Sequence, residues 1–141
     1  MIARRRMLAL MASASLAGVA VLGCKKEPRC AHCGMKLDPS SAWTTELTGP
    51  EPAKYDTPRC ALIAWRKGEH PATGVRVVEY YDRVPRDGAD VLFVVGSDVL
   101  GPMGPDVVPV APDKAERFVK DHGGRKLALA EVTAQVLEES K

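Results

Sequence analysis

The chain has 141 residues, a length that suits one domain and hardly two. Its 20 lysines and arginines stand against 18 aspartates and glutamates, which gives a formal net charge of +2. Three of these basic residues are consecutive arginines at positions 4–6, so the remainder of the chain is slightly acidic. No basic patch remains that would suit a nucleic acid, and we exclude that class of partner.

The first 23 residues are predicted to be a lipoprotein signal peptide. The three arginines precede an apolar and small-residue run over residues 7–21, which is too short to span a bilayer comfortably. The run ends at Val21-Leu22-Gly23-Cys24, which resembles the lipobox of bacterial lipoproteins, although Leu22 is not the small residue usual there. The arginines also fit a twin-arginine signal loosely, so the export route stays open between Sec and Tat.

In such lipoproteins the lipobox cysteine is acylated and becomes the first residue of the mature protein. We therefore expect Cys24 to be the lipid anchor and residues 24–29 to be a short lipidated tether. Removal of the signal leaves 118 residues, with 17 basic residues against 18 acidic ones. The predicted location is the cell envelope, on a membrane surface that faces the periplasm.

Residues 30–141 are predicted to form one compact α+β domain. In its first half, Thr57 and Pro58 are typical of a helix start, and Gly68 is typical of a helix end. Segments rich in β-branched and aromatic residues flank this helix. The predicted elements are strands over residues 43–47, 53–56 and 75–81 and a helix over residues 58–67.

The second half repeats this order of elements without repeating the sequence. A continuous apolar strand is followed by a loop dense in Gly and Pro, and Pro109 assigns the next short strand to a sheet edge. The predicted elements are strands over residues 91–95, 107–110 and 126–129 and helices over residues 112–122 and 130–139. The fold is thus predicted to be two successive ββαβ units with a C-terminal helix.

The densest chemistry lies in Cys30-Ala31-His32-Cys33-Gly34-Met35. Gly34 can adopt a positive φ, which would let Cys33 and Met35 aim at one point. Thiolates and thioethers suit a soft ion such as Cu(I) better than a hard cation. With Cys24 bound to lipid, three thiols remain, and this odd number does not suit a pure disulfide framework.

The Cys-x-x-Cys spacing is compatible with other chemistry. A zinc site of three cysteines and one histidine, a redox pair, and a structural disulfide between Cys30 and Cys33 all stay open. A zinc ribbon would supply a second cysteine pair, whereas Cys60 is the only further thiol of the mature chain. A thioredoxin-like pair would lie at a strand-to-helix junction rather than in a loop.

Three residues outside the Cys-Gly-Met element are further candidate ligands. Met103 lies in Gly101-Pro102-Met103-Gly104-Pro105, and the only two methionines after the signal thus lie in glycine-containing turns. That coincidence favours a ligand over a methionine that covers the core. Cys60 opens the predicted first helix, whose dipole would lower the pKa of its thiol, or it is simply a small half-buried residue. His32 either adds an imidazole or faces solvent.

These motifs, in this order and spacing, resemble the NosL family. The resemblance covers roughly residues 24–129, and it rests on Cys30 to Met35, Tyr55-Asp56, Val94 to Ser97, Pro102 to Gly104 and Ala115 to Phe118. Members are copper-binding lipoproteins associated with the maturation of nitrous oxide reductase. The double ββαβ order is also shared with organomercurial lyases.

The resemblance implies a periplasmic Cu(I) chaperone that is not an enzyme. It implies that Cys30, Cys33, Met35 and Met103 hold the metal, and that copper-enzyme assembly machinery in the membrane or periplasm receives it. The alternative is a thiol-dependent enzyme, a thiol-disulfide oxidoreductase or a lyase, that uses Cys30 and Cys33. Fold analogy alone is weak evidence for such an activity.

Overall fold

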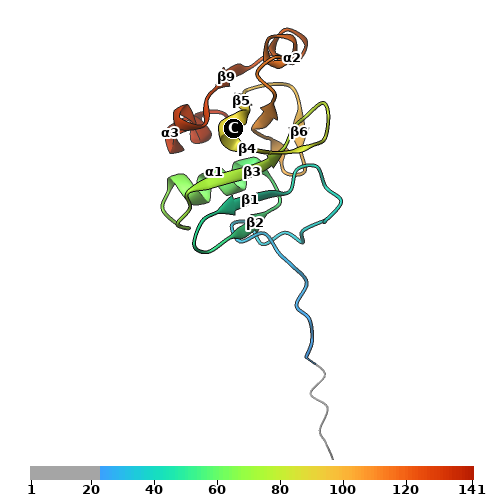
Figure 1. Ribbon diagram of the computed structural model, residues 1–141, viewed down its shortest axis with the longest axis vertical. Helices are drawn as coiled ribbons and strands as arrows, with labels where there is room; N and C mark the ends of the chain where they lie inside the picture. The colour runs from blue at the N-terminus through green and yellow to red at the C-terminus, as the bar shows by residue number, and fades with distance from the viewer. Residues whose placement is uncertain (1–22) are drawn as a thin grey trace, which may run out of the picture.

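The computed structural model describes residues 23–141, so the predicted signal peptide lies, except for Gly23, outside the described residues. Residues 23–29 are exposed and lead as an extended segment to the folded body (Figure 1). Within the described part of the chain, no helix has both the length and the apolar character needed to cross a membrane.

The first unit is an antiparallel sheet covered by one helix. Its strands are β1 (Thr45–Thr48), β2 (Ala53–Tyr55), β3 (Gly74–Val78) and β4 (Pro85–Asp87), in the order β2-β1-β3-β4. Leu47 of β1 lies opposite both Ala53 and Val75, and Val75 and Val77 share one buried face of β3. Helix α1 (Pro58–Arg66) packs against this sheet with its buried residues Ala61 and Leu62.

The second unit repeats this topology. Its strands β5 (Leu92–Val95), β8 (Val108–Val110) and β9 (Arg125–Leu127) are antiparallel in the order β8-β5-β9, and α2 (Ala115–His122) lies between the last two along the chain. In both units the first strand is therefore central, with the second and third strands on either side. The predicted α+β class and the double ββαβ order are confirmed, and Pro109 lies on the edge strand β8 as expected.

Three elements differ from the prediction. Residues 85–87 form β4, which the sequence did not suggest, because β3 offers an open edge to a segment without strand character. The Gly- and Pro-rich loop contains a small hairpin of β6 (Leu100–Gly101) and β7 (Gly104–Pro105). The predicted last helix is divided into a 3-10 turn η2 (Leu129–Glu131) and α3 (Ala134–Glu139), because the side chain of Thr133 caps α3.

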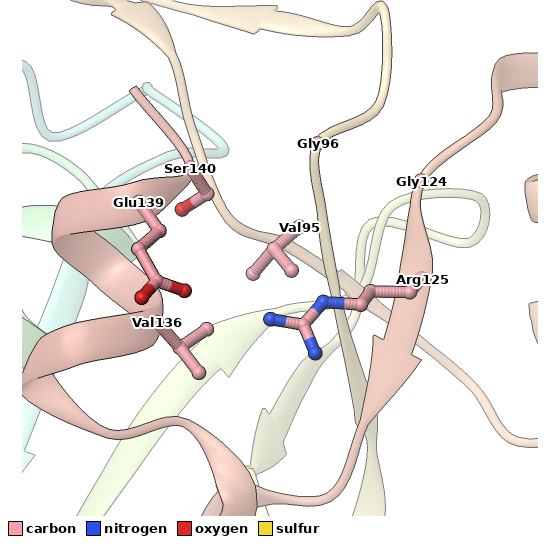
Figure 2. Close-up of a pocket in the computed structure, with 7 residues that line it drawn as sticks. All are labelled: Val95, Gly96, Gly124, Arg125, Val136, Glu139 and Ser140. Carbon is pink, nitrogen blue, oxygen red and sulfur yellow. The ribbon is translucent and has the colours of Figure 1, made fainter.

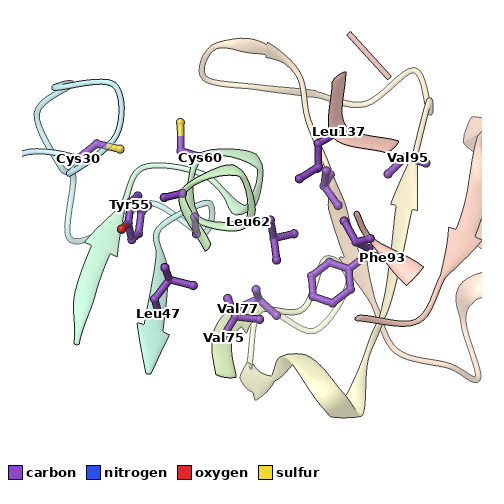
Figure 3. Close-up of a cluster of buried hydrophobic side chains, with 14 of the residues drawn as sticks. Cys30, Leu47, Tyr55, Cys60, Leu62, Val75, Val77, Phe93, Val95 and Leu137 are labelled. Atoms are coloured by element: carbon purple, nitrogen blue, oxygen red, sulfur yellow. The ribbon is translucent and has the colours of Figure 1, made fainter. Parts of the chain in front are cut away.

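The main core joins the two units. Buried side chains of the first sheet and α1 pack with Phe93 of β5 and Leu137 of α3 (Figure 3). Cys30 and Cys60 lie at one end of this core, beside Tyr55. The two buried cysteines therefore lie at the end of the core where β2 is followed by α1.

Candidate metal centre

The cysteine loop is a closed hairpin of main chain. The amide of Cys30 donates to the carbonyl of Met35 at 2.7 Å, and the amide of Gly34 donates to the carbonyl of Cys30 at 3.0 Å. Gly34 has a φ of 78°, the left-handed conformation predicted for it. The turn thus brings Cys30, Cys33 and Met35 into one short loop whose ends are held together by the bridge between Arg29 and Lys36.

Two thiols of this loop meet a third thiol and one carboxylate from elsewhere in the chain. One ligand atom each from Cys30, Cys33, Asp56 and Cys60 lies within 4.8 Å of all the others; we call these four residues the cysteine cluster. Cys30, Asp56 and Cys60 are buried, whereas Cys33 is exposed. All four cysteines of the chain, Cys24 included, are free thiols, so this structure contains no disulfide between Cys30 and Cys33.

Two local signals in the sequence bring Asp56 and Cys60 into the cluster. Asp56 follows directly after β2, and Thr57 then takes an extended conformation with a φ of −142° and caps α1. The hydroxyl of Thr57 accepts a hydrogen bond from the amide of Cys60 at 3.2 Å. This cap fixes Cys60 in the first turn of the helix, four residues after Asp56.

Asp56 is a candidate ligand that the sequence did not indicate. One carboxylate oxygen accepts a hydrogen bond from the Cys33 thiol at 3.4 Å, while the other is buried without any partner. An unpartnered buried carboxylate oxygen is unfavourable unless a cation or donor compensates it. The cluster thus fits a metal ion, and the carboxylate position at the junction of strand and helix cap was the available signal.

The cluster keeps the thiols of Cys33 and Cys60 protonated in the metal-free protein. Burial raises the pKa of Cys60 above that of a free thiol, and the neighbouring Asp56 carboxylate raises it further. Cys33 is exposed as a residue, but its sulfur is partly shielded from water beside Asp56, and this partial burial is the main cause that raises the pKa of its thiol. The prediction that the helix dipole lowers the pKa of Cys60 is therefore wrong, because burial and the carboxylate outweigh the dipole.

The two candidate methionines lie at the surface. Met35 is 39% exposed and Met103 is 55% exposed, so Met103 does not cover the core. A hollow of about 210 Å³ connects the methionine segments with the cluster, since Met35, Asp56 and Pro102 all line it. Met103 directly follows Pro102 at the turn between β6 and β7.

His32 lies in the cysteine loop but is directed elsewhere. Its ring nitrogen Nδ1 lies 2.9 Å from a carboxylate oxygen of Glu69, which follows α1. The fourth member of the cluster is Asp56 and not this histidine. The three-cysteine, one-histidine arrangement considered from the sequence is therefore replaced by three cysteines and one carboxylate.

A larger hollow lies elsewhere in the fold. It measures about 430 Å³ and opens between the ends of β5 and β9 and helix α3 (Figure 2). Arg125, Glu139 and Ser140 are its polar side chains, and no cysteine or methionine lines it. This hollow therefore lacks the sulfur ligands that soft metals prefer.

Comparisons with known proteins identify relatives of the chain. The family model described as NosL matches residues 22–137. The structure is similar to the crystal structure of the copper chaperone NosL from Shewanella denitrificans, with a TM-score of 0.63 and 22% identity over 76% of this chain and 90% of that one. It is also similar to the solution NMR structure of the apo-NosL protein from Achromobacter cycloclastes, with a TM-score of 0.50 and 28% identity over 66% of this chain and 87% of that one. No curated protein matches the chain significantly. Since the family model spans most of the sequence, the chain belongs to the NosL family.

Proposed function

We propose that this protein is a membrane-anchored Cu(I) chaperone that delivers copper to the machinery that assembles a copper enzyme such as nitrous oxide reductase. The observation that carries the proposal is the cysteine cluster with its unpartnered Asp56 oxygen. Family membership and similarity to a structure described as a copper chaperone support copper as the metal. The three thiols favour the cuprous state, because soft sulfur ligands select Cu(I).

The division between buried and exposed ligands suggests how copper is handed over. Cys30 and Cys60 are buried, so they are the ligands that retain the ion. Cys33, Met35 and Met103 are exposed, so an acceptor can approach the ion from their side. Copper would then move by exchange of one ligand at a time, with the neutral thioethers as the ligands released most easily.

The tether supports a role at a membrane surface. Cys30, the first proposed ligand, lies six positions after the proposed lipid anchor Cys24, with residues 25–29 between them. A fully extended chain of this length spans at most about 20 Å. Acylation of Cys24 would therefore hold the metal centre close to the membrane, where a membrane-bound or periplasmic acceptor collects the ion.

Anaerobic titration against a Cu(I) chelator tests this function. We expect the wild-type chain to bind one Cu(I). Replacement of both Cys33 and Met103 by alanine should weaken binding at least about tenfold, since even the loss of outer contacts around a metal typically costs that much. The control is His32→Ala, which changes the same loop at a residue paired with Glu69 and should bind like wild type. If the double variant binds Cu(I) as tightly as wild type, Cys33 and Met103 are not ligands.

Zn(II) is a second candidate metal, favoured by the carboxylate of Asp56. Three thiolates and one carboxylate oxygen can complete a tetrahedral zinc site without any thioether. Zinc binding should therefore be indifferent to Met103→Ala, whereas Cu(I) binding should not. X-ray absorption of the chain loaded with each metal counts sulfur against oxygen neighbours and separates the two.

The enzymatic alternative, which would use Cys30 and Cys33, receives no support from the thiol of Cys33. A nucleophilic cysteine needs a lowered pKa in an accessible position. Burial instead raises the pKa of both Cys33 and Cys60. A thiol-disulfide exchange assay on the metal-free protein should therefore show no turnover.

A further inference from the structure

The hairpin that carries Met103 is attached to the helix that carries Cys60. Asp106, which follows β7, is only 4% exposed. One of its carboxylate oxygens accepts hydrogen bonds from the backbone amides of Arg59 at 3.0 Å and Val107 at 2.8 Å. Because Arg59 directly precedes Cys60, this carboxylate joins the base of the hairpin to the first turn of α1.

The side chain of Arg59 makes a second attachment. Its Nε donates to the carbonyl of Pro105 in β7 at 3.1 Å. Its terminal nitrogens donate to the carbonyls of Leu137 and Ser140 at the end of α3. The base of the hairpin is therefore fixed from two directions at the point where α1 begins.

Gly101 of β6 packs directly on the Asp106 carboxyl group. A Cβ atom at position 101 would lie 2.9 Å from Oδ2, 3.0 Å from Cβ and 3.2 Å from Cγ of Asp106. The carboxyl group cannot retreat easily, because it is buried and holds two backbone amides. Any side chain at position 101 must therefore push β6 away from the Asp106 carboxyl group.

We infer that the contact between Gly101 and Asp106 positions Met103 as a copper ligand. The inference rests on the proposed function, in which Met103 and the cysteine cluster hold one Cu(I) ion. Gly101 pairs with Gly104 and directly precedes the two-residue turn, so a shift of Gly101 moves the tip by a similar amount. Pro102 at that tip already lines the same hollow as Met35 and Asp56.

The test is a double-mutant cycle of Gly101→Ala and Met103→Ala, read out by Cu(I) affinity under anaerobic conditions. Gly101→Ala alone should weaken Cu(I) binding about tenfold, as is typical when a residue that orients a ligand is changed. X-ray absorption of this variant should show one sulfur neighbour fewer. Leu100→Ala is the matched control, because it changes an exposed side chain on the same strand and should leave both measurements unchanged.

The cycle distinguishes failure of the proposed function from failure of the positioning role. If Met103→Ala alone binds Cu(I) like wild type, the ligand assignment in the proposed function is wrong. If Met103→Ala weakens binding but Gly101→Ala does not, or if Gly101→Ala weakens binding equally in the Met103→Ala background, the positioning role is wrong. Should Gly101→Ala not fold, Arg59→Gln takes its place in the same cycle, since it removes the attachment at Pro105.

Discussion

The protonated thiols of Cys33 and Cys60 make copper binding depend on pH. Burial raises the pKa of both, so the metal-free protein keeps both protons at neutral pH. A metal binds the thiolate, so each thiol that becomes a ligand must release its proton. Neutral pH lies below the pKa of both thiols. The Cu(I) affinity should therefore rise by about tenfold per pH unit for each thiol that loses its proton on binding.

Chelator competition at pH 6, 7 and 8 measures this slope, once the pH dependence of the chelator itself is subtracted. The variant Cys60→Ser should lower the slope of Cu(I) affinity against pH by the contribution of one proton. The contribution of the Cys33 proton should remain. An affinity that does not change with pH would show that neither thiol loses a proton on binding.

At the level of single residues, the sequence indicated the three cysteines of the cluster, Cys60 only as a possible ligand, and it missed Asp56. Cys30, Cys33 and Met35 are close in sequence, so a short loop suffices to gather them. Asp56 lies far from all three along the chain. Its side chain enters the cluster only because β2 ends beside the loop and α1 starts there. Such a contact depends on tertiary packing, which spacing along the chain does not reveal.

Single elements were predictable where local chemistry determines them. Thr57 and Pro58 define the start of α1, and β8 lies at an edge because Pro109 lacks an amide proton. β4 and the β6–β7 hairpin were not predictable, because their strands contain no β-branched or aromatic residue and form through pairing with a neighbour.

One buried carboxylate links the two ββαβ units and gives a stability prediction. Glu79, which follows β3, is completely buried. Its carboxylate accepts from the amides of Tyr81 and Asp82, both at 2.7 Å, and from the amide of Ala111 after β8 at 3.0 Å. Glu79→Ala should lower the free energy of unfolding by about 3 kcal/mol, because three backbone amides, that of Ala111 buried, lose their acceptor.

Urea denaturation measures this loss. The exposed Glu51 offers the control, and Glu51→Ala should change the free energy of unfolding by less than about 0.5 kcal/mol. If the two variants were equally stable, Glu79 would not hold the units together.

At the level of the whole molecule, a metal ion in the cysteine cluster would tie together three segments that the chain supplies separately. Cys30 and Cys33 come from the N-terminal loop, Asp56 from the end of β2 and Cys60 from α1. Both ββαβ units pack into one main core, and the cluster lies at the end of that core. A metal ion that stabilises the cluster should therefore stabilise the whole fold.

Because the complete ligand set exists only in the folded chain, Cu(I) should stabilise the native state. At a free metal concentration about 1,000 times the dissociation constant, the gain is about 4 kcal/mol. For a domain of this size that corresponds to a rise in the melting temperature of about 10 to 20 °C. Scanning calorimetry under anaerobic conditions should find this rise in the wild type and in Cys24→Ser, whose changed residue lies outside the cluster. Cys60→Ser should show a much smaller rise, because it removes a buried ligand, and an equal rise in that variant would place the bound copper elsewhere.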